Sequence, residues 1–222
     1  MDDSQRQLSL SKTNIITFNC SGIKSSREYI CNFLSKNMDI IALQETWLMP
    51  HEISLPDSLS EDFEAFSISS VNVDEKILRG RPYGGLTFLW HKKLSQRAQI
   101  VKYDDDRLLG LMISYDELNV LFLNVYLPDV SNDNGNDEFM FYLGKILSIA
   151  SDPEVDAICI LGDFNAGSDT VRLQELMSAC LENDLVVADM EVLPPDSYTH
   201  ANNNNISFSW LDHAVLSRNI LH

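Results

Sequence analysis

AICILGDFNA, residues 157–166, joins a short apolar run to a polar end, and this combination decides the fold class. Ala157–Leu161 has the length and apolar composition of a buried strand. Asp163 and Asn165 follow at the point where that strand runs out. The stretch therefore predicts a core strand that carries polar side chains to the edge of a sheet.

The same arrangement recurs along the chain. Further buried strands are predicted at 14–18 (NIITF), 39–43 (DIIAL), 85–90 (GLTFLW), 120–125 (VLFLNV) and 214–216 (AVL). Helices are predicted from a Ser25/Glu28 capping box to about Asn37, and over 137–150 and 170–181. The stretch 194–205 (PPDSYTHANNNN) is the clearest loop. Strands mixed with helices and no internal repeat favour a layered α/β or α+β domain.

The length of 222 residues suits one compact domain over 13–222 after a polar leader, 1–12. The leader has no apolar signal region, and no apolar run approaches the ~18 residues that span a bilayer. We therefore expect an intracellular protein, nuclear or cytoplasmic, that is neither secreted nor inserted in a membrane. The four cysteines form no CxxC pair, so we expect reduced core residues.

The charge balance argues against a polyanionic partner without excluding one. There are 16 Lys and Arg residues against 33 Asp and Glu residues, a net charge of −17. Such a charge repels nucleic acid at long range, although salt screens most of that field. A bound divalent cation and a local basic surface could still attract a phosphodiester at short range; candidates for that surface are Arg79, Arg81, Lys92 and Lys93.

Polar residues stand where the predicted strands end, at Asn19, Gln44, Glu45, Tyr126, Asp163 and Asn165. Strand ends of a layered domain share one rim, so these groups are expected to converge on one site. Each residue alone is more often a turn former, a helix cap, a core tyrosine or a solvated carboxylate. The joint pattern is what indicates a functional site.

The chemistry that such a rim supports is hydrolysis of a phosphate ester. Glu45 with Asn19 offers the hard oxygen ligands that Mg²⁺ takes while it keeps several waters. Asp163 could align or deprotonate the attacking water, and Asn165 and the Tyr126 hydroxyl could stabilise charge on phosphorus.

Six phrases carry a family resemblance: TFNCSGIKSS, DIIALQETWL, GRPYGGLTFLWHKKL, LNVYLPD, ILGDFNA and SFSWLDHAVLS. In this order and at roughly this spacing they resemble the endonuclease/exonuclease/phosphatase superfamily, and in particular the apurinic/apyrimidinic-type endonucleases of non-LTR retrotransposons. The resemblance covers Thr13 to Ser217. It implies an α+β fold, a four-layered αββα sandwich of two mixed sheets flanked by helices.

The resemblance also implies a role for each matching residue. Glu45 of QET would bind Mg²⁺ or Mn²⁺ with Asn19 beside it, and Asp163 and Asn165 of GDFN would handle the nucleophile and the scissile phosphate, with Tyr126 close by. Asp212 of WLDH would orient a catalytic histidine, and Thr199 would be a supporting contact. Arg81, from the basic residues named above, is a further candidate for substrate binding. The substrate would be DNA, and the partner a fused or neighbouring reverse transcriptase domain; otherwise we expect a monomer.

The sequence departs from the family pattern after WLDH. The family ends in Ser-Asp-His beyond that strand, whereas here His222 is terminal and neither His213 nor His222 follows Ser-Asp. We therefore expect a domain that lacks its last strand and its catalytic histidine and that is a poor or inactive nuclease. His213 reads as a strand residue and His222 as coincidental. Robust activity would direct attention to His200 or His213 as a substitute.

Two alternatives stay open beside a DNA-nicking endonuclease or its remnant. One is a phosphatase or phospholipase of the same superfamily that acts on an inositol phosphate or sphingolipid head group, which the acidic charge mildly favours. The other is a catalytically inert fragment that serves as a binding module.

Overall fold

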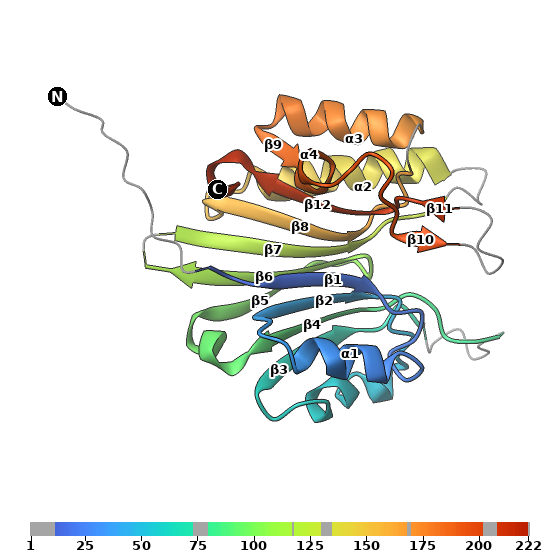
Figure 1. The fold of residues 1–222 in the computed structure, drawn as a ribbon, viewed down its shortest axis with the longest axis vertical. Coiled ribbons are helices and arrows are strands. Elements are labelled where there is room, and N and C mark those ends of the chain that lie inside the picture. Colours follow the sequence, from blue (N-terminus) through green and yellow to red (C-terminus); the bar gives the residue numbers. More distant parts are fainter. Residues whose placement is uncertain are drawn as a thin grey trace.

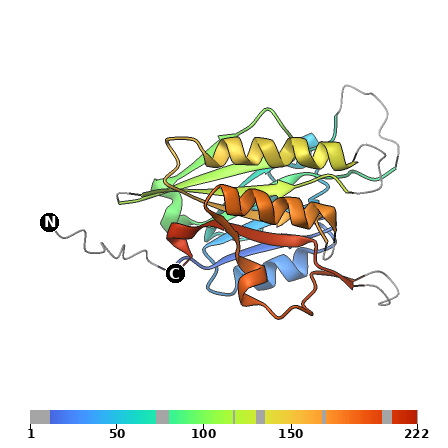
Figure 2. The ribbon, with the colours of Figure 1, turned by 90° about the horizontal axis from the view of Figure 1, so that it is seen from above.

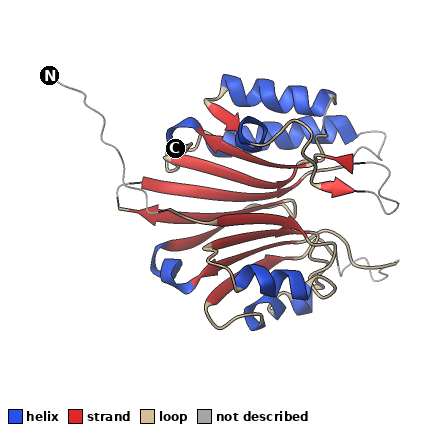
Figure 3. Cartoon of the chain, in the orientation of Figure 1, coloured by secondary structure: helices blue, strands red, loops and turns tan. Residues whose placement is uncertain are grey.

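Two β-sheets stack face to face, and helices cover the outer side of each (Figures 1 and 3). The structure is a computed structural model that describes residues 12–72, 80–116, 118–129, 135–167, 170–201 and 208–221. Most of the polar leader, 1–11, and the terminal His222 lie outside these ranges. The layers confirm the expected α+β class and the αββα sandwich of two mixed sheets.

The smaller sheet has four strands in the order β1-β2-β4-β3. Strands β1 and β2 are parallel, and the other pairs are antiparallel. Helix α1 (Arg27–Leu34) packs on the outer face with the short 3-10 segments η1 (Pro50–Glu52) and η2 (Leu55–Ser58). The strand bounds are β1 Ile15–Asn19, β2 Ile40–Gln44, β3 Phe63–Ile68 and β4 Leu86–His91.

The larger sheet has six strands in the order β5-β6-β7-β8-β12-β9, and only β7 and β8 run parallel. Helices α2 (Gly135–Ala150) and α3 (Val171–Glu182) lie side by side on its outer face (Figure 2). The strand bounds are β5 Ala98–Lys102, β6 Leu108–Tyr115, β7 Leu118–Tyr126, β8 Ala157–Asp163, β9 Leu185–Val187 and β12 Asp212–Ser217.

The remaining elements are short. A two-stranded hairpin, β10 (His200–Ala201) with β11 (Phe208–Ser209), projects beside the larger sheet. Helix α4 (Ala188–Val192) follows β9, and two 3-10 segments, η3 (Lys92–Arg97) and η4 (Arg218–Ile220), follow β4 and β12. The stretch that we predicted as a loop, 194–205, therefore contains strand β10, while 202–207 lies outside the described residues.

The predicted capping box at Ser25 is wrong. Helix α1 begins at Arg27, with Ser26 rather than Ser25 at its N-cap and no side-chain cap. The Ser25 hydroxyl instead donates to the Gly22 carbonyl at 2.8 Å, and the Ser26 hydroxyl donates to the Cys20 carbonyl at 2.6 Å. Both hydroxyls thus stabilise the turn between β1 and the helix.

A buried polar contact joins the two sheets through an otherwise apolar interface. Asn124 of β7 is fully buried and donates to the carbonyls of Leu43 at 3.0 Å and Thr87 at 3.1 Å in the smaller sheet. Its Oδ1 accepts from Gln44 Nε2 at 2.6 Å, and Gln44 also bonds Thr17. Because buried polar groups need partners, these bonds fix one position of the sheets against each other.

The cysteines are free, as expected for reduced residues; Cys20, Cys159 and Cys180 are buried and Cys31 is half-buried. Burial raises the pKa of the Cys159 thiol to about 12, so this cysteine is an inert core residue. Among the described helices, none has the length and apolar character needed to cross a bilayer.

Asn124→Ala tests the contact between the sheets. The variant leaves the Leu43 and Thr87 carbonyls without their buried donor, so we expect a loss of about 1–3 kcal/mol in the free energy of unfolding. The control is Asn119→Ala on the same strand, whose side chain accepts from the exposed Ser114 hydroxyl and which should change stability by less than about 0.5 kcal/mol. Urea unfolding measures both, and equal losses would contradict a special role for Asn124.

Candidate active site

Four strands end at one rim of the sandwich and bring their polar side chains together. Strand β1 ends at Asn19, β2 is followed by Glu45, β7 ends at Tyr126 and β8 ends at Asp163. Strand β12 is antiparallel to β8 and begins at this rim, with Asp212 opposite Asp163. Parallel pairing within each sheet is the reason that residues so far apart in the sequence meet.

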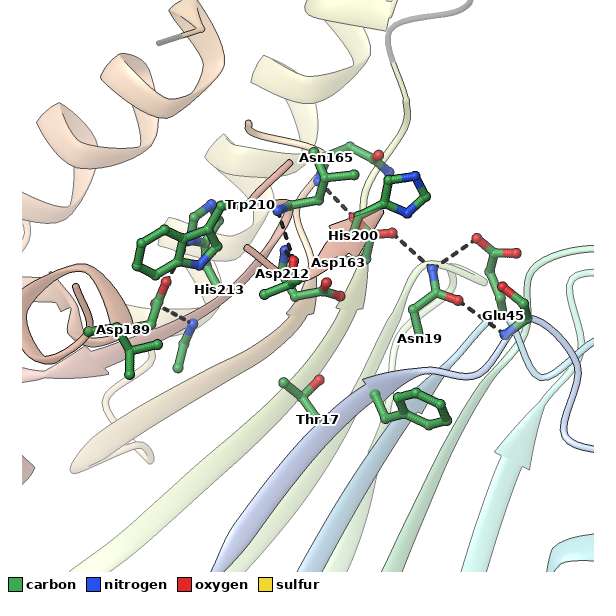
Figure 4. Close-up of a pocket in the computed structure, with 16 residues that line it drawn as sticks. Thr17, Asn19, Glu45, Asp163, Asn165, Asp189, His200, Trp210, Asp212 and His213 are labelled. Atoms are coloured by element: carbon green, nitrogen blue, oxygen red, sulfur yellow. Dashed lines mark hydrogen bonds and ion pairs between the residues drawn. The ribbon is translucent and has the colours of Figure 1, made fainter. Parts of the chain in front are cut away.

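A cavity of about 450 Å³ lies at this rim (Figure 4). Its walls include the predicted residues Asn19, Glu45, Asp163, Asn165, Asp212 and Thr199. His200 and His213 also line it. Tyr126 is not in the described lining, but it lies close by: burial, and then the charge of Glu45, raise the pKa of its hydroxyl.

The Asn19 amide bridges the two sheets at the cavity. Its Nδ2 donates to Glu45 Oε1 at 2.9 Å and to Asp163 Oδ2 at 3.0 Å. The second Glu45 oxygen accepts from the Trp47 indole at 3.1 Å, and the second Asp163 oxygen accepts from the Asn165 backbone N–H at 2.9 Å. Both carboxylates are therefore held in fixed orientations.

The backbone after β2 adopts an uncommon conformation that sets the direction of Glu45. Glu45 and Trp47 have φ angles of 51° and 53°, in the left-handed region that non-glycine residues rarely enter. Such residues cost on the order of 1–3 kcal/mol each, so surrounding contacts must hold them. Gly22 N–H bonds the Glu45 carbonyl at 2.7 Å, and Thr46 and Trp47 N–H bond Gly85 and Gly84 of the GRPYGG phrase.

The glycine of GDFN, Gly162, is required because a side chain would not fit at this position. Gly162 has a φ of 143°, and a Cβ there would lie 2.0 Å from the Val125 carbonyl oxygen of β7. Only glycine allows β7 and β8 to approach this closely. The next residue, Asp163, then pairs with Tyr126 across the two strands at the cavity.

The cavity is short of positive charge. Burial, and then the charges of Asp212 and Glu45, raise the pKa of Asp163 to about 7, although hydrogen bonds from Asn165 and Asn19 oppose the shift. Burial also raises the pKa of Asp212, whose Oδ1 is buried without a hydrogen-bond partner in the described part of the chain. A cation or a strong hydrogen-bond donor beside these two carboxyl groups would stabilise their charged forms and lower both pKa values.

Hard oxygen donors dominate this wall, but they do not enclose an ion. Within the described ranges no three Asp, Glu, His or Cys side chains come close enough to hold a metal together. A cation here would take Glu45 as its carboxylate ligand and complete its shell with water, which is the mode that Mg²⁺ prefers.

Arg81 and Thr199 lie at the edge of the site and contact neighbouring residues of the cavity wall. The Arg81 guanidinium lies 4.0 Å over the ring of Trp47, the residue that bonds Glu45. The Thr199 hydroxyl accepts from the Leu211 and Asp212 backbone N–H groups at 3.0 and 3.1 Å. Thr199 therefore orients Asp212, while substrate contact by either residue stays a prediction.

The expected basic surface is not assembled at this rim. Strand β4 is antiparallel to β2, so Leu86 lies at the cavity end and Lys92 and Lys93, which follow His91, lie at the opposite end. Lys93 pairs there with the buried carboxylate of Asp39. Arg79 lies outside the described residues.

The two histidines that line the cavity have different environments. His213 is 1% exposed, and its ring nitrogens contact Asp189 Oδ2 at 2.8 Å and the Ala166 carbonyl at 3.0 Å. Both partners are hydrogen-bond acceptors, and the pKa of the ring is raised, which favours an imidazolium that donates from both nitrogens inside the core. His200 is exposed and lines the cavity. It lies in the stretch that we predicted as a loop, and its position next to Thr199 is the one sequence feature that pointed to a place at the site.

A family profile matches nearly the whole chain. The profile describes the endonuclease/exonuclease/phosphatase family and matches residues 16–221. A search of curated proteins found no significant match.

Solved structures share the fold at low sequence identity. A 3′ phosphatase from Neisseria bound to a product DNA hairpin superposes with a TM-score of 0.72 at 15% identity, over 95% of this chain and 88% of that one. The endonuclease domain of TRAS1, a telomere-specific non-LTR retrotransposon, gives 0.64 at 13% identity, over 94% and 86%. A mannosyl-6-phosphatase from Bacteroides thetaiotaomicron gives 0.65 at 13% identity, over 93% and 86%.

The buried His213 predicts a pH dependence of stability. Burial lowers its pKa, but the bonds to Asp189 and Ala166 and the nearby carboxylates outweigh burial and raise it above the ordinary value. The stabilisation should therefore be complete below about pH 6.5 and be lost as the pH rises through the raised pKa. His213→Gln should cost about 3–5 kcal/mol at pH 6 and remove this decline.

Urea unfolding between pH 6 and pH 9 measures the decline, with exposed His51→Gln as the control that keeps it. An unchanged pH profile in His213→Gln would contradict the buried imidazolium.

Proposed function

The chain belongs to the endonuclease/exonuclease/phosphatase family, and from that premise we propose that it is a divalent-metal-dependent phosphodiesterase that nicks DNA. The observation that carries the proposal is the Asn19 amide held between Glu45 and Asp163, with Asp212 beside them in one cavity. Carboxylates ordered in this way suit a metal ligand and a general base.

The residues present fit a divalent cation. Glu45 supplies a hard carboxylate ligand and Asn19 lies against it, while burial, and then the charges of Asp212 and Glu45, raise the pKa of Asp163. Mg²⁺ or Mn²⁺ bound at Glu45 would polarise a phosphoryl oxygen and offset the charge of the carboxylates. Because one carboxylate and an amide are few ligands, binding should be weak.

The chain's own residues would position the other reactants. Asp163 would accept the proton of a water that attacks phosphorus, and Asn165, whose amide donates to the Leu127 carbonyl at 2.8 Å, would stand beside the phosphate. Tyr126 keeps its proton because burial, and then Glu45 and Asp163, raise its pKa, so its hydroxyl remains a hydrogen-bond donor. Arg81 and Thr199 would contact the nucleic acid from the edge of the cavity.

DNA is the substrate that the fold comparisons support best. The Neisseria enzyme holds a DNA hairpin and the TRAS1 domain comes from a retrotransposon, although both likenesses are to the fold alone. We accordingly propose a monomeric, intracellular endonuclease module that acts beside a reverse transcriptase domain.

A phosphatase is the second candidate. The net charge of −17 disfavours a long polyanion but not a small phosphate ester, and the mannosyl-6-phosphatase shares this fold. Hydrolysis of inositol or sugar phosphates without DNA nicking would favour this candidate.

Nicking of supercoiled plasmid tests the first candidate. We expect metal-dependent nicking that falls by about 10²–10⁴-fold in Asp163→Asn, because a general base contributes a factor of this size. The matched control is Asp57→Asn on the exposed segment η2, which should nick as the unaltered protein does. Nicking that needs no metal, or that survives Asp163→Asn, would overturn the proposal.

A further inference from the structure

His200 points into the cavity from the hairpin, beside Asp163 and Asn165 and facing the Asn19–Glu45 side (Figure 4). We propose that its imidazole is a further substrate-binding donor of this site, which contacts a non-bridging oxygen of the phosphate under attack. The inference rests on the proposed phosphodiesterase activity and names a residue that carries part of it.

Among the ionisable side chains that line the cavity, the imidazoles are the hydrogen-bond donors, and they add to the Asn165 amide and the Tyr126 hydroxyl. The described lining contains carboxylates from Glu45, Asp163, Asp189 and Asp212 but no Lys or Arg. A phosphate that enters would meet acceptors on most sides, and anions need donors. The second imidazole, His213, is occupied on both nitrogens by the core.

The backbone of His200 is fixed even though its ring is exposed. His200 pairs with Ser209 in the hairpin, and the preceding Thr199 N–H bonds the Ser209 carbonyl at 3.0 Å. The Thr199 hydroxyl ties the hairpin to Leu211 and Asp212 at the start of β12. The ring is therefore presented at the cavity by a short, anchored strand.

The charged groups around His200 are acidic and near. Burial raises the pKa of Asp212, and the charge of His200 is among the influences that lower it, which places the ring within electrostatic reach of that carboxyl. Asp163 and Glu45 lie further along the same wall.

Hydrolysis of the phosphodiester does not require a proton from His200. The water oxygen forms a bond to phosphorus as its proton passes to Asp163, and the bond to the leaving oxygen breaks with its electron pair going to that oxygen, which takes a proton from solvent. The His200 N–H only hydrogen-bonds the charge that grows on the non-bridging oxygen, and it does so more strongly in the transition state.

Kinetics of three variants test the inference. His200→Ala should lower kcat of plasmid nicking by about 10²–10³-fold, the usual cost of one such donor, with little change in melting temperature because the ring is exposed. His200→Gln keeps a neutral N–H donor and should recover part of the rate. His51→Gln, an exposed histidine outside the cavity lining, should match the unaltered protein.

A binding experiment separates this inference from the proposed function. In the ¹H–¹⁵N spectrum of the imidazoles, inorganic phosphate should shift the His200 signal and leave the His213 signal in place. If the protein nicks DNA and His200→Ala nicks equally well, the inference fails and the function stands. If it hydrolyses nothing but phosphate still shifts His200, the function fails and the contact stands. No shift at saturating phosphate would overturn the contact.

Discussion

The hydrogen bonds of Asn124 across the sandwich set the position of everything at the rim. The Asn124 amide of β7 donates to the carbonyls of Leu43 in β2 and Thr87 in β4, and its oxygen accepts from Gln44. Gln44 follows Leu43 in β2, and Glu45 comes next. Tyr126 lies two residues beyond Asn124 on the same strand. Because strand side chains alternate between faces, a slip of one residue would turn these groups away from the cavity. The apolar interface is non-directional, so it cannot specify this register by itself.

The site that results opposes the stability of the fold. Glu45, Asp163 and Asp212 share a partly buried wall, and the pKa of Asp163 rises to about 7 because its charge is poorly solvated there. Left-handed backbone at Glu45, Trp47 and Asn165 adds local strain. Strain and like charges that persist in a folded protein are typical of functional sites, where a cation and an anionic substrate offset them. The described lining of the cavity contains no Lys or Arg, so the imidazole of His200 is a candidate donor to an anionic substrate.

The sequence predicted the central strands and the rim residues because both depend on local pattern. Short apolar runs ending in polar residues marked β1, β2, β4, β7 and β8, and Asn19, Glu45 and Asp163 are their terminal groups or neighbours. Strands β3, β5 and β9 were missed, since their half-buried or three-residue patterns resemble loops until their pairing partners are known, and β6 was missed although most of its residues are buried. The hairpin of His200 was missed because each of its strands has only two residues, and the placement of Lys92 at the far end of β4 depends on the pairing of β4 with β2.

The claim on which this account depends is that Glu45, with Asn19 beside it, is the cation ligand of the cavity. Crystals soaked in Mn²⁺ and measured at the manganese absorption edge would test it directly through the anomalous difference map. We expect one peak at coordination distance from Glu45, on the side that faces Asp163, and no peak there in Glu45→Gln crystals. Manganese bound elsewhere, with this wall empty at saturating concentration, would contradict it.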